Sequence, residues 1–194
     1  MELLTEKQQL RRQMRAARKA IPPQERARMD AALLQNILSH PPYVQADVLL
    51  LYVSAGGEAD TRALLESALA CGRKVALPKC EGPGEMRFFL VNSMNELTSG
   101  AYGIPEPTGR EMPVLTSQTF CLVPGVAFTS DGHRLGQGGG YYDRFLAQNP
   151  FIRTAGVCYA LQLTDSLPHA PHDRVMEAII TEQTVEVCHG TQIR

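Results

Sequence analysis

Short apolar runs alternate with amphipathic helical patterns along most of the chain. The runs hold almost no polar residues, which is typical of strands that are buried on both faces. They lie at residues 48–53, 75–77, 88–91, 120–123, 155–158 and 178–180. Between the first two, Asp60 to Cys71 has leucines at helical spacing, with Asp60 as a natural N-cap and Gly72 as a stop signal. This order builds parallel sheets, so the pattern predicts an α/β fold with three layers, a mostly parallel sheet flanked by helices.

Two amphipathic helices are predicted ahead of the first apolar run. Thr5 followed by Gln8 is a capping-box pattern that marks the start of the first helix. Its apolar positions recur at helical spacing: Leu10, Met14 and Ala17. The prolines at 22 and 23 end this helix and begin the next, because proline is tolerated in a first turn. The buried stripe of the second helix is Leu33, Leu34, Ile37 and Leu38.

Composition narrows the class of protein. The chain has 194 residues, of which 44% are hydrophobic and 20% charged, so we expect one globular domain over residues 1–194. A net charge of -1 gives no basic field for nucleic acid. No apolar run approaches the roughly 20 residues that cross a bilayer, and the start lacks a signal-peptide pattern. We therefore expect a cytoplasmic monomer that binds neither nucleic acid nor membrane.

Other irregular and reactive positions carry weaker signals. The segment 102–109 is rich in proline and glycine and is predicted to be a surface loop. The five cysteines have no C-x-x-C spacing, so we interpret them as reduced thiols, with Cys188 the one not expected in the core. His169 and His172 suggest zinc, but no third ligand at a fixed spacing accompanies them, and surface histidines are the favoured interpretation.

The richest chemical pattern is the glycine-rich stretch that follows the run 120–123. Four glycines, at 136, 138, 139 and 140, fall within five positions and lead into a predicted helix that ends near Gln148. Glycine lets backbone N–H groups approach a ligand closely, and the start of a helix favours negative charge. The stretch therefore predicts a phosphate cradle, although it has neither Walker A nor dinucleotide-binding spacing. A flexible surface turn is the alternative interpretation.

Polar side chains around these glycines favour the cradle. Arg134 can bind a phosphate with two hydrogen bonds, Tyr141 and Tyr142 can pack against a planar ring, and Asp143 can hold Mg²⁺. A bare turn would need none of them. Alternatively, Asp143 complements the helix dipole and the tyrosines belong to the core.

At these residues the chain resembles the 5-formyltetrahydrofolate cyclo-ligase family. The run from Arg134 to Asp143 is similar to the signature of that family, together with residues 124–128 and 131–132 before it. Other landmarks follow in the same order along nearly the whole chain: Lys7-x-x-Leu10-Arg11, residues 54–61, residues 103–107, and the segment from Leu167 to Asp173 ahead of the run that ends at Thr181.

The resemblance implies a role for each matching position. The ATP-binding positions would be Lys7, Gln8, Gln9, Leu10, Arg11, Arg134, Leu135, Gly136, Gln137, Gly138, Gly139, Gly140, Tyr141 and Tyr142. The folate-binding positions would be Val53, Glu58, Gln137, Gly138, Gly139, Gly140 and Tyr141. The metal ligands would be Asp143 and Asp173, and the catalytic residues Arg134, Tyr142 and Asp143. Some relatives have basic residues at positions 137 and 139, so charge at those two points has no part in this chain's mechanism.

The resemblance also implies the reaction. ATP with Mg²⁺ would phosphorylate the formyl oxygen of 5-formyltetrahydrofolate, and N10 would then close the ring to give 5,10-methenyltetrahydrofolate, ADP and phosphate. Phosphoryl transfer needs mainly positioning and charge neutralisation. From the residues alone, Glu58 is equally consistent with a contact to the pterin amino edge or with a solvated loop acid. Two alternatives remain: a sugar-phosphate isomerase-like enzyme that needs no ATP, and a non-catalytic module that binds ATP or folate.

Overall fold

A mostly parallel sheet of seven strands forms the centre of the molecule. The computed structural model describes residues 2–168 and 174–188, without the side chains of residues 2–4. In spatial order the strands are β11 (Val185–Val187), β10 (Ala178–Ile180), β9 (Arg153–Val157), β6 (Phe120–Pro124), β1 (Leu49–Leu50), β2 (Val75–Gly82) and β3 (Glu85–Val91). Only the outer pairs β2–β3 and β10–β11 are antiparallel.

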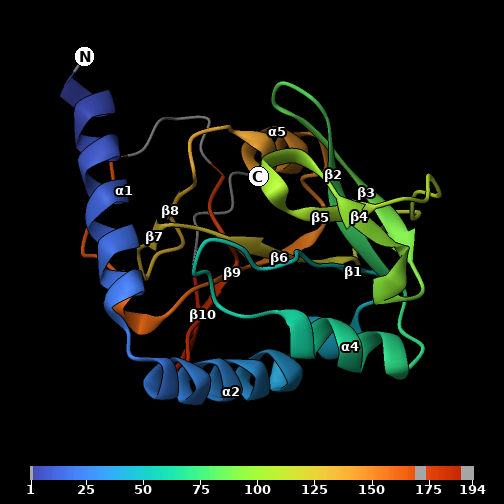
Figure 1. The fold of residues 1–194 in the computed structure, drawn as a ribbon. Coiled ribbons are helices and arrows are strands. Elements are labelled where there is room, and N and C mark those ends of the chain that lie inside the picture. The colour runs from blue at the N-terminus through green and yellow to red at the C-terminus, as the bar shows by residue number, and fades with distance from the viewer. Residues whose placement is uncertain (1, 169–173, 189–194) are drawn as a thin grey trace.

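Helices cover both faces of the sheet, which confirms the predicted α/β fold and its layers (Figure 1). One face carries α2 (Pro23–Ser39) and α4 (Arg62–Ala70), and the other carries α5 (Tyr141–Gln148). Leu49 and Leu51 belong to the core cluster of α2 and α4, whereas Leu50 between them belongs to that of α5. This alternation follows from the two-residue period of a strand and explains why the runs contain so few polar residues.

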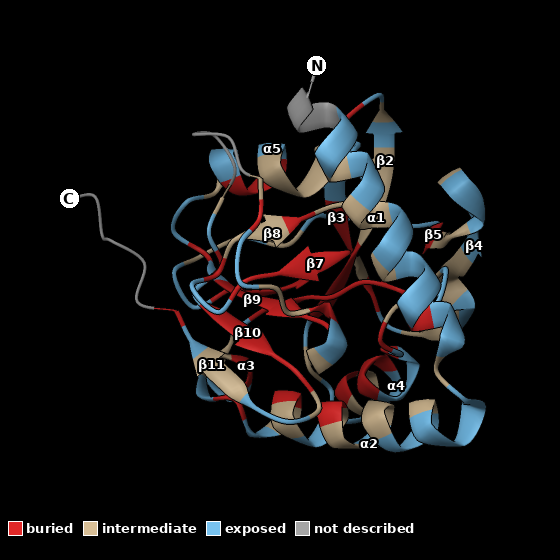
Figure 2. Ribbon diagram, turned by 90° about the vertical axis from the view of Figure 1, so that its left-hand side faces the viewer, coloured by how far each residue is buried: buried red, intermediate tan, exposed pale blue. Residues whose placement is uncertain are grey.

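The remaining elements are short or lie at the margins of the sheet. The long helix α1 (Glu2–Ala20) lies beside the small pair β7 (Ala127–Phe128) and β8 (Arg134–Leu135), and most of its surface is exposed (Figures 1 and 2). The others are α3 (Pro41–Gln45), β4 (Leu97–Ser99), β5 (Pro105–Pro107), and the 3-10 turns η1 (Met94–Glu96), η2 (Ala101–Gly103) and η3 (Ala160–Gln162). No helix among the described residues is long and apolar enough to span a membrane.

Several local predictions are wrong. Helix α1 begins at Glu2, so Thr5 lies inside it and is not a cap. Its inward face buries Arg18 rather than Ala17, which is exposed. Helix α4 begins at Arg62 after Thr61, although the Asp60 carboxylate still accepts a hydrogen bond of 3.0 Å from the Arg62 amide.

Two further predictions also need correction: that residues 102–109 form a loop, and which of the cysteines lie in the core. Within that segment β5 pairs with β4. Glu106 is buried, and its carboxylate accepts hydrogen bonds from the amides of Cys80 and Ala101. All five cysteines are free, as expected. However, Cys188 is buried, whereas Cys71 at the end of α4 is exposed.

Candidate functional site

The candidate site lies at the edge of the sheet where the parallel strands end. Loops leave this edge after β1, at residues 51–61, and after β6, at residues 125–126 and 136–140 around β7 and β8. The turn between β2 and β3, residues 83–84, lies at the same edge because β2 runs parallel to β1. Ligand sites of open α/β sheets form at this edge, since loops from neighbouring strands converge there.

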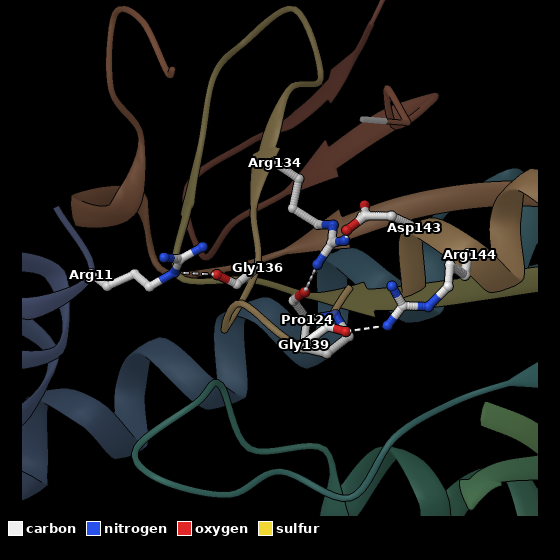
Figure 3. Close-up of polar contacts among 7 residues, drawn as sticks. All are labelled: Arg11, Pro124, Arg134, Gly136, Gly139, Asp143 and Arg144. Atoms are coloured by element: carbon white, nitrogen blue, oxygen red, sulfur yellow. Dashed lines mark hydrogen bonds and ion pairs between the residues drawn. The ribbon is translucent and has the colours of Figure 1, made fainter. Parts of the chain in front are cut away.

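Arginines of α1 and α5 bind carbonyls of the glycine-rich loop (Figure 3). Arg11 of α1 donates from Nε to the carbonyl of Gly136 at 2.8 Å. On the other side, Arg144 of α5 donates to the carbonyl of Gly139 and, at 2.7 Å, to that of Gly84 in the β2–β3 turn. Arg134 of β8 donates instead to the carbonyl of Pro124, at the end of β6, at 3.2 Å. The loop is therefore fixed between α1 and the β2–β3 turn, which argues against a flexible surface turn.

Arginine side chains bind the carbonyls of Gly136 and Gly139, whereas the amides of the loop are free. Within the described part of the chain, no amide of residues 136–140 donates a hydrogen bond. Gly138 and Gly140 have φ values of +110° and +66°, which a residue with a side chain rarely adopts. The second of these directly precedes α5, whose first-turn amides have no partner inside the helix. The unpaired N–H groups thus fall in one short stretch at a helix start, where backbone amides commonly bind anions.

Arg134 and Asp143, which flank the loop in the sequence, form an ion pair. Nη2 of Arg134 lies 2.6 Å from Oδ1 of Asp143, and the two side chains are 4% and 25% exposed. The Arg134 guanidinium also lies over the ring of Tyr142, 5.7 Å from its centroid. Arg134 therefore binds protein groups on two sides here, a use that the sequence did not suggest. Asp143 keeps its second carboxylate oxygen available.

Two buried polar atoms beside this ion pair have no partner among the described residues. They are Nε of Arg134 and the hydroxyl of Tyr142. Burial raises the pKa of Tyr142, so its hydroxyl is protonated and can donate. Unsatisfied buried polar groups cost free energy, and they gather at places where a bound molecule completes the hydrogen bonding.

Glu58 is connected to the glycine-rich loop and to α1. Its carboxylate accepts the amide of Ala55 at 3.1 Å and the side-chain amide of Gln137 at 3.4 Å. The oxygen of the Gln137 amide in turn accepts a hydrogen bond of 2.5 Å from Arg15. Burial raises the pKa of Glu58, while these contacts and the nearby charge of Arg18 lower it. Glu58 is therefore part of a network and not a solvated loop acid.

An open cavity of about 680 Å³ lies on the far side of the loop from α1. It is lined by the β2–β3 turn, η2, Tyr141 and Arg144. Tyr102 contributes a ring that is 80% exposed on a backbone with φ of +58°, and its hydroxyl lies 3.2 Å from that of Tyr141. An exposed aromatic residue in such a strained conformation is often part of a binding site, because a ligand can offset the cost.

The other predicted residues fall into three groups. Lys7 is half-buried on α1, whereas Gln8 and Gln9 are exposed. Leu10 packs with the buried Leu135, so neither offers its side chain to a ligand. Val53, just past β1, is buried in the main core. Asp173, His169 and His172 lie outside the described residues.

Four residues of the site escaped prediction from sequence. Arg15 and Arg18 follow Arg11 at helical spacing, so the three share one face of α1, a pattern that a solvated helix face also produces. Arg18 is 2% exposed, and its guanidinium donates to the carbonyl of Gly56 at 3.4 Å. Arg144 and Tyr102 have no pattern that separates them from surface residues.

The described residues suit a magnesium ion bound together with phosphate. They contain no group of three acidic, histidine or cysteine side chains that would hold a metal by themselves. Mg²⁺ needs no such group, because it keeps several waters and binds one or two carboxylates plus phosphate oxygens. The available oxygen of Asp143 beside the free amides of the loop meets this requirement.

Comparison with known proteins identifies the family. Residues 4–182 match the model of the 5-formyltetrahydrofolate cyclo-ligase family. The 5-formyltetrahydrofolate cyclo-ligase of Escherichia coli K12 is 32% identical over 178 residues, which cover 89% of this chain and 98% of the relative. The NMR structure of the 5,10-methenyltetrahydrofolate synthetase of Aquifex aeolicus superposes with a TM-score of 0.82 at 32% identity, covering 97% of this chain and 95% of that one.

A further solved structure supports the fold alone. The 5,10-methenyltetrahydrofolate synthetase of Mycoplasma pneumoniae has a TM-score of 0.71 at 24% identity, covering 91% of this chain and 98% of that one. The resemblance that the sequence suggested is thus confirmed over nearly its whole length. The chain belongs to the 5-formyltetrahydrofolate cyclo-ligase family.

Proposed function

We propose that this protein converts 5-formyltetrahydrofolate into 5,10-methenyltetrahydrofolate, using ATP with Mg²⁺ and releasing ADP and phosphate. Membership of the cyclo-ligase family supports the folate reaction. One structural observation supports the nucleotide: Arg11 and Arg144 bind the carbonyls of Gly136 and Gly139, while the amides of the glycine-rich loop face no acceptor among the described residues. An anion bound at this loop would supply the acceptor that these amides lack.

The terminal phosphates of ATP fit at this loop. The free amides of residues 136–140 and the start of α5 would bind phosphate oxygens, as helix starts and glycine loops do elsewhere. Arg11 adds positive charge where it contacts Gly136, and the unpaired Nε of Arg134 offers a further hydrogen-bond donor. A magnesium ion held by Asp143 and the phosphates would neutralise negative charge on the transferring group. Asp173 is our second proposed ligand, from the family signature.

The folate fits between Glu58 and the cavity lined by Tyr102 and Tyr141. The Glu58 carboxylate would accept hydrogen bonds from the amino edge of the pterin, and the buried Tyr142 hydroxyl could donate to a ring carbonyl or to the formyl oxygen. Each partner would gain a hydrogen bond that it lacks in the free protein. The exposed ring of Tyr102 and the half-buried ring of Tyr141 suit the planar part of the substrate.

The reaction needs two bonds to form in sequence. The formyl oxygen attacks the γ-phosphorus, the bond to the β-phosphate oxygen breaks, and ADP leaves. N10 then attacks the activated formyl carbon, the C–O bond breaks with release of phosphate, and N10 loses its proton. Holding the oxygen in line and N10 close can contribute up to roughly 7–11 kcal/mol, so positioning by the fixed loop is the main contribution of the protein.

An absorbance assay tests the proposal. The protein is incubated with 5-formyltetrahydrofolate and MgATP, and the methenyl product is followed by its absorbance. We expect turnover that requires both ATP and Mg²⁺, and a loss of about tenfold or more in kcat/KM for Asp143→Ala. Arg12→Gln, a change on the exposed face of α1, is the matched control and should behave as wild type. Absence of the methenyl product with wild-type protein would contradict the proposal and favour the isomerase-like or non-catalytic alternative.

Labelling the formyl oxygen with ¹⁸O tests the chemical step itself. Phosphorylation of that oxygen transfers the label into the released phosphate, one atom per turnover. Unlabelled phosphate would exclude this route even if the methenyl product forms.

A further inference from the structure

Arg144 lies at a junction between two parts of the site that are distant in sequence. Its guanidinium donates from Nε to the carbonyl of Gly84 at 2.7 Å. From Nη2 it donates to the carbonyl of Gly139, as Figure 3 shows. The first carbonyl belongs to the β2–β3 turn, which lines the cavity proposed for the folate, and the second belongs to the loop proposed for the phosphates. One side chain of α5 therefore joins the walls of both proposed substrate sites.

The β2–β3 turn has little support within its own hairpin. β1 pairs only with the first two residues of β2, so the distal end of the hairpin extends beyond the sheet. The central residues of the turn are Pro83 and Gly84. Two-residue hairpins favour a positive φ at the first central residue, which proline cannot adopt. Among the described residues, the bond from Arg144 is the only hydrogen bond between residues 81–85 and another element.

Glycines leave room for the guanidinium of Arg144. A methyl group added at Gly84 would overlap it, and one added at Gly140 would lie 2.9 Å from Nη1. Within the described part of the chain no carboxylate pairs with Arg144, so neutral carbonyls are its hydrogen-bond partners. A charged donor makes stronger hydrogen bonds than a neutral one, which favours a bridge to two acceptors.

We propose that Arg144 is a positioning residue that sets the distance between the two substrates by tying the β2–β3 turn to the glycine-rich loop. This inference rests on the proposed function and adds a residue that acts through the carbonyls of Gly84 and Gly139. A guanidinium suits this task because its planar fork holds two acceptors in a fixed geometry. Phosphoryl transfer needs the formyl oxygen in line with the γ-phosphate, and an error of about 1 Å in such an arrangement can lower the rate about a hundredfold.

Steady-state kinetics of Arg144→Met test the proposal. The variant keeps the aliphatic stem and loses both hydrogen bonds, whereas Glu58 and the amides of the glycine-rich loop remain. We therefore expect kcat to fall about tenfold or more, while KM for either substrate changes about threefold or less. Arg144→Lys keeps the charge but lacks the fork, so it should recover only part of kcat.

Two results of these kinetics would overturn the inference. The first is an unchanged kcat in Arg144→Met, whatever its KM values, because the bridge would then have no part in the transfer step. The second is a wild-type kcat in Arg144→Lys, which would assign the effect to charge alone.

Gly84→Ala breaks the bridge in an independent way, because the added methyl group displaces the guanidinium. Gly72→Ala is its matched control: φ is +67° there and +77° at Gly84, and nothing lies within 4 Å of the added methyl group. Gly84→Ala should lower kcat as Arg144→Met does, whereas Gly72→Ala should not. Arg87→Gln, an exposed change on the same hairpin, controls for the loss of one charge. Equal values of kcat in Gly84→Ala and Gly72→Ala would contradict the bridge.

Thermal unfolding separates this inference from the proposed function, because it needs no substrate. Gly84→Ala should lower Tm more in wild type, where the methyl group meets the guanidinium, than in Arg144→Met, where only the strain of a positive φ remains. Such coupling supports the bridge even if the wild-type protein yields no methenyl product. Equal losses of Tm in the two backgrounds would overturn it. Methenyl product formed by Arg144→Met at the wild-type kcat contradicts the positioning role alone and leaves the proposed function intact.

Discussion

The ion pair between Arg134 and Asp143 predicts a specific pattern of stability changes. Its atoms are 2.6 Å apart, with side-chain exposures of 4% and 25%. Removing one partner of a buried pair costs about 3–5 kcal/mol, because the other charge stays buried without compensation. Asp143 is partly solvated, so we expect the lower end, about 3 kcal/mol, for Asp143→Ala. In a protein of this size that loss lowers Tm by about 6–12 °C.

Removing the other partner should cost less. In Arg134→Met the aliphatic volume is kept, and the carboxylate that remains can hydrate, so we expect a loss of about 1–2 kcal/mol. The double variant should then lose less than the sum of the two single variants by about 1 kcal/mol or more. Denaturant and thermal unfolding of the four proteins measure this difference. Strict additivity would refute the reasoning, since it would mean that the two side chains do not interact.

The same variants separate the ion pair from metal binding. If Asp143 holds magnesium, Asp143→Ala should need a higher Mg²⁺ concentration for half-maximal rate, whereas Arg134→Met should not, because it keeps the carboxylate. Wild-type magnesium dependence in Asp143→Ala would leave Asp143 with no role beyond its contact with Arg134.

Three further predictions concern the surrounding network. Burial raises the pKa of Glu58, and the proposed pterin contact needs the ionised carboxylate, so KM for folate should rise as pH falls through that pKa. The variant Glu58→Gln should lack this pH dependence. A wild-type pH profile of KM in that variant would contradict the proposed role of Glu58. Arg18→Met should raise KM for folate severalfold with little change in Tm. The reason is that Nε of Arg18 is buried without a hydrogen-bond partner, so it is available to the substrate and contributes little to the free protein. An unchanged KM would mean that Arg18 only packs against its neighbours. Gly140→Ala should lower stability by about 1 kcal/mol, or about 2–4 °C in Tm, since φ is +66° there; no loss on thermal unfolding would mean that the turn relaxes freely.

The sequence predicts the sheet and its layers because burial on both faces leaves a strong pattern. β10 coincides with the predicted run 178–180, and α5 ends at Gln148 as expected. β1 is a strand only at Leu49–Leu50, although residues 48–53 are all buried, because burial and regular pairing are different properties. The pairing of β5 with β4 could not be predicted, since each strand has three residues and β5 contains two prolines.

Sequence patterns indicated the glycine-rich loop but not its contacts. Glycine spacing indicated the loop, yet its contact with Arg11 and its link through Arg144 to Gly84 join elements that are distant in sequence. The burial of Arg18 contradicts the usual behaviour of arginine, so an amphipathic pattern assigns it to solvent. Its neighbours from the loop after β1 become apparent only in three dimensions.

The central claim is that the glycine-rich loop holds the terminal phosphates of ATP beside a magnesium ion. A crystal structure with a non-hydrolysable ATP analogue and Mg²⁺ tests it most directly. We expect phosphate oxygens within hydrogen-bonding distance of the amides of residues 136–140, and the metal ion on the carboxylate of Asp143. A triphosphate bound elsewhere, with these amides facing only solvent, would contradict it.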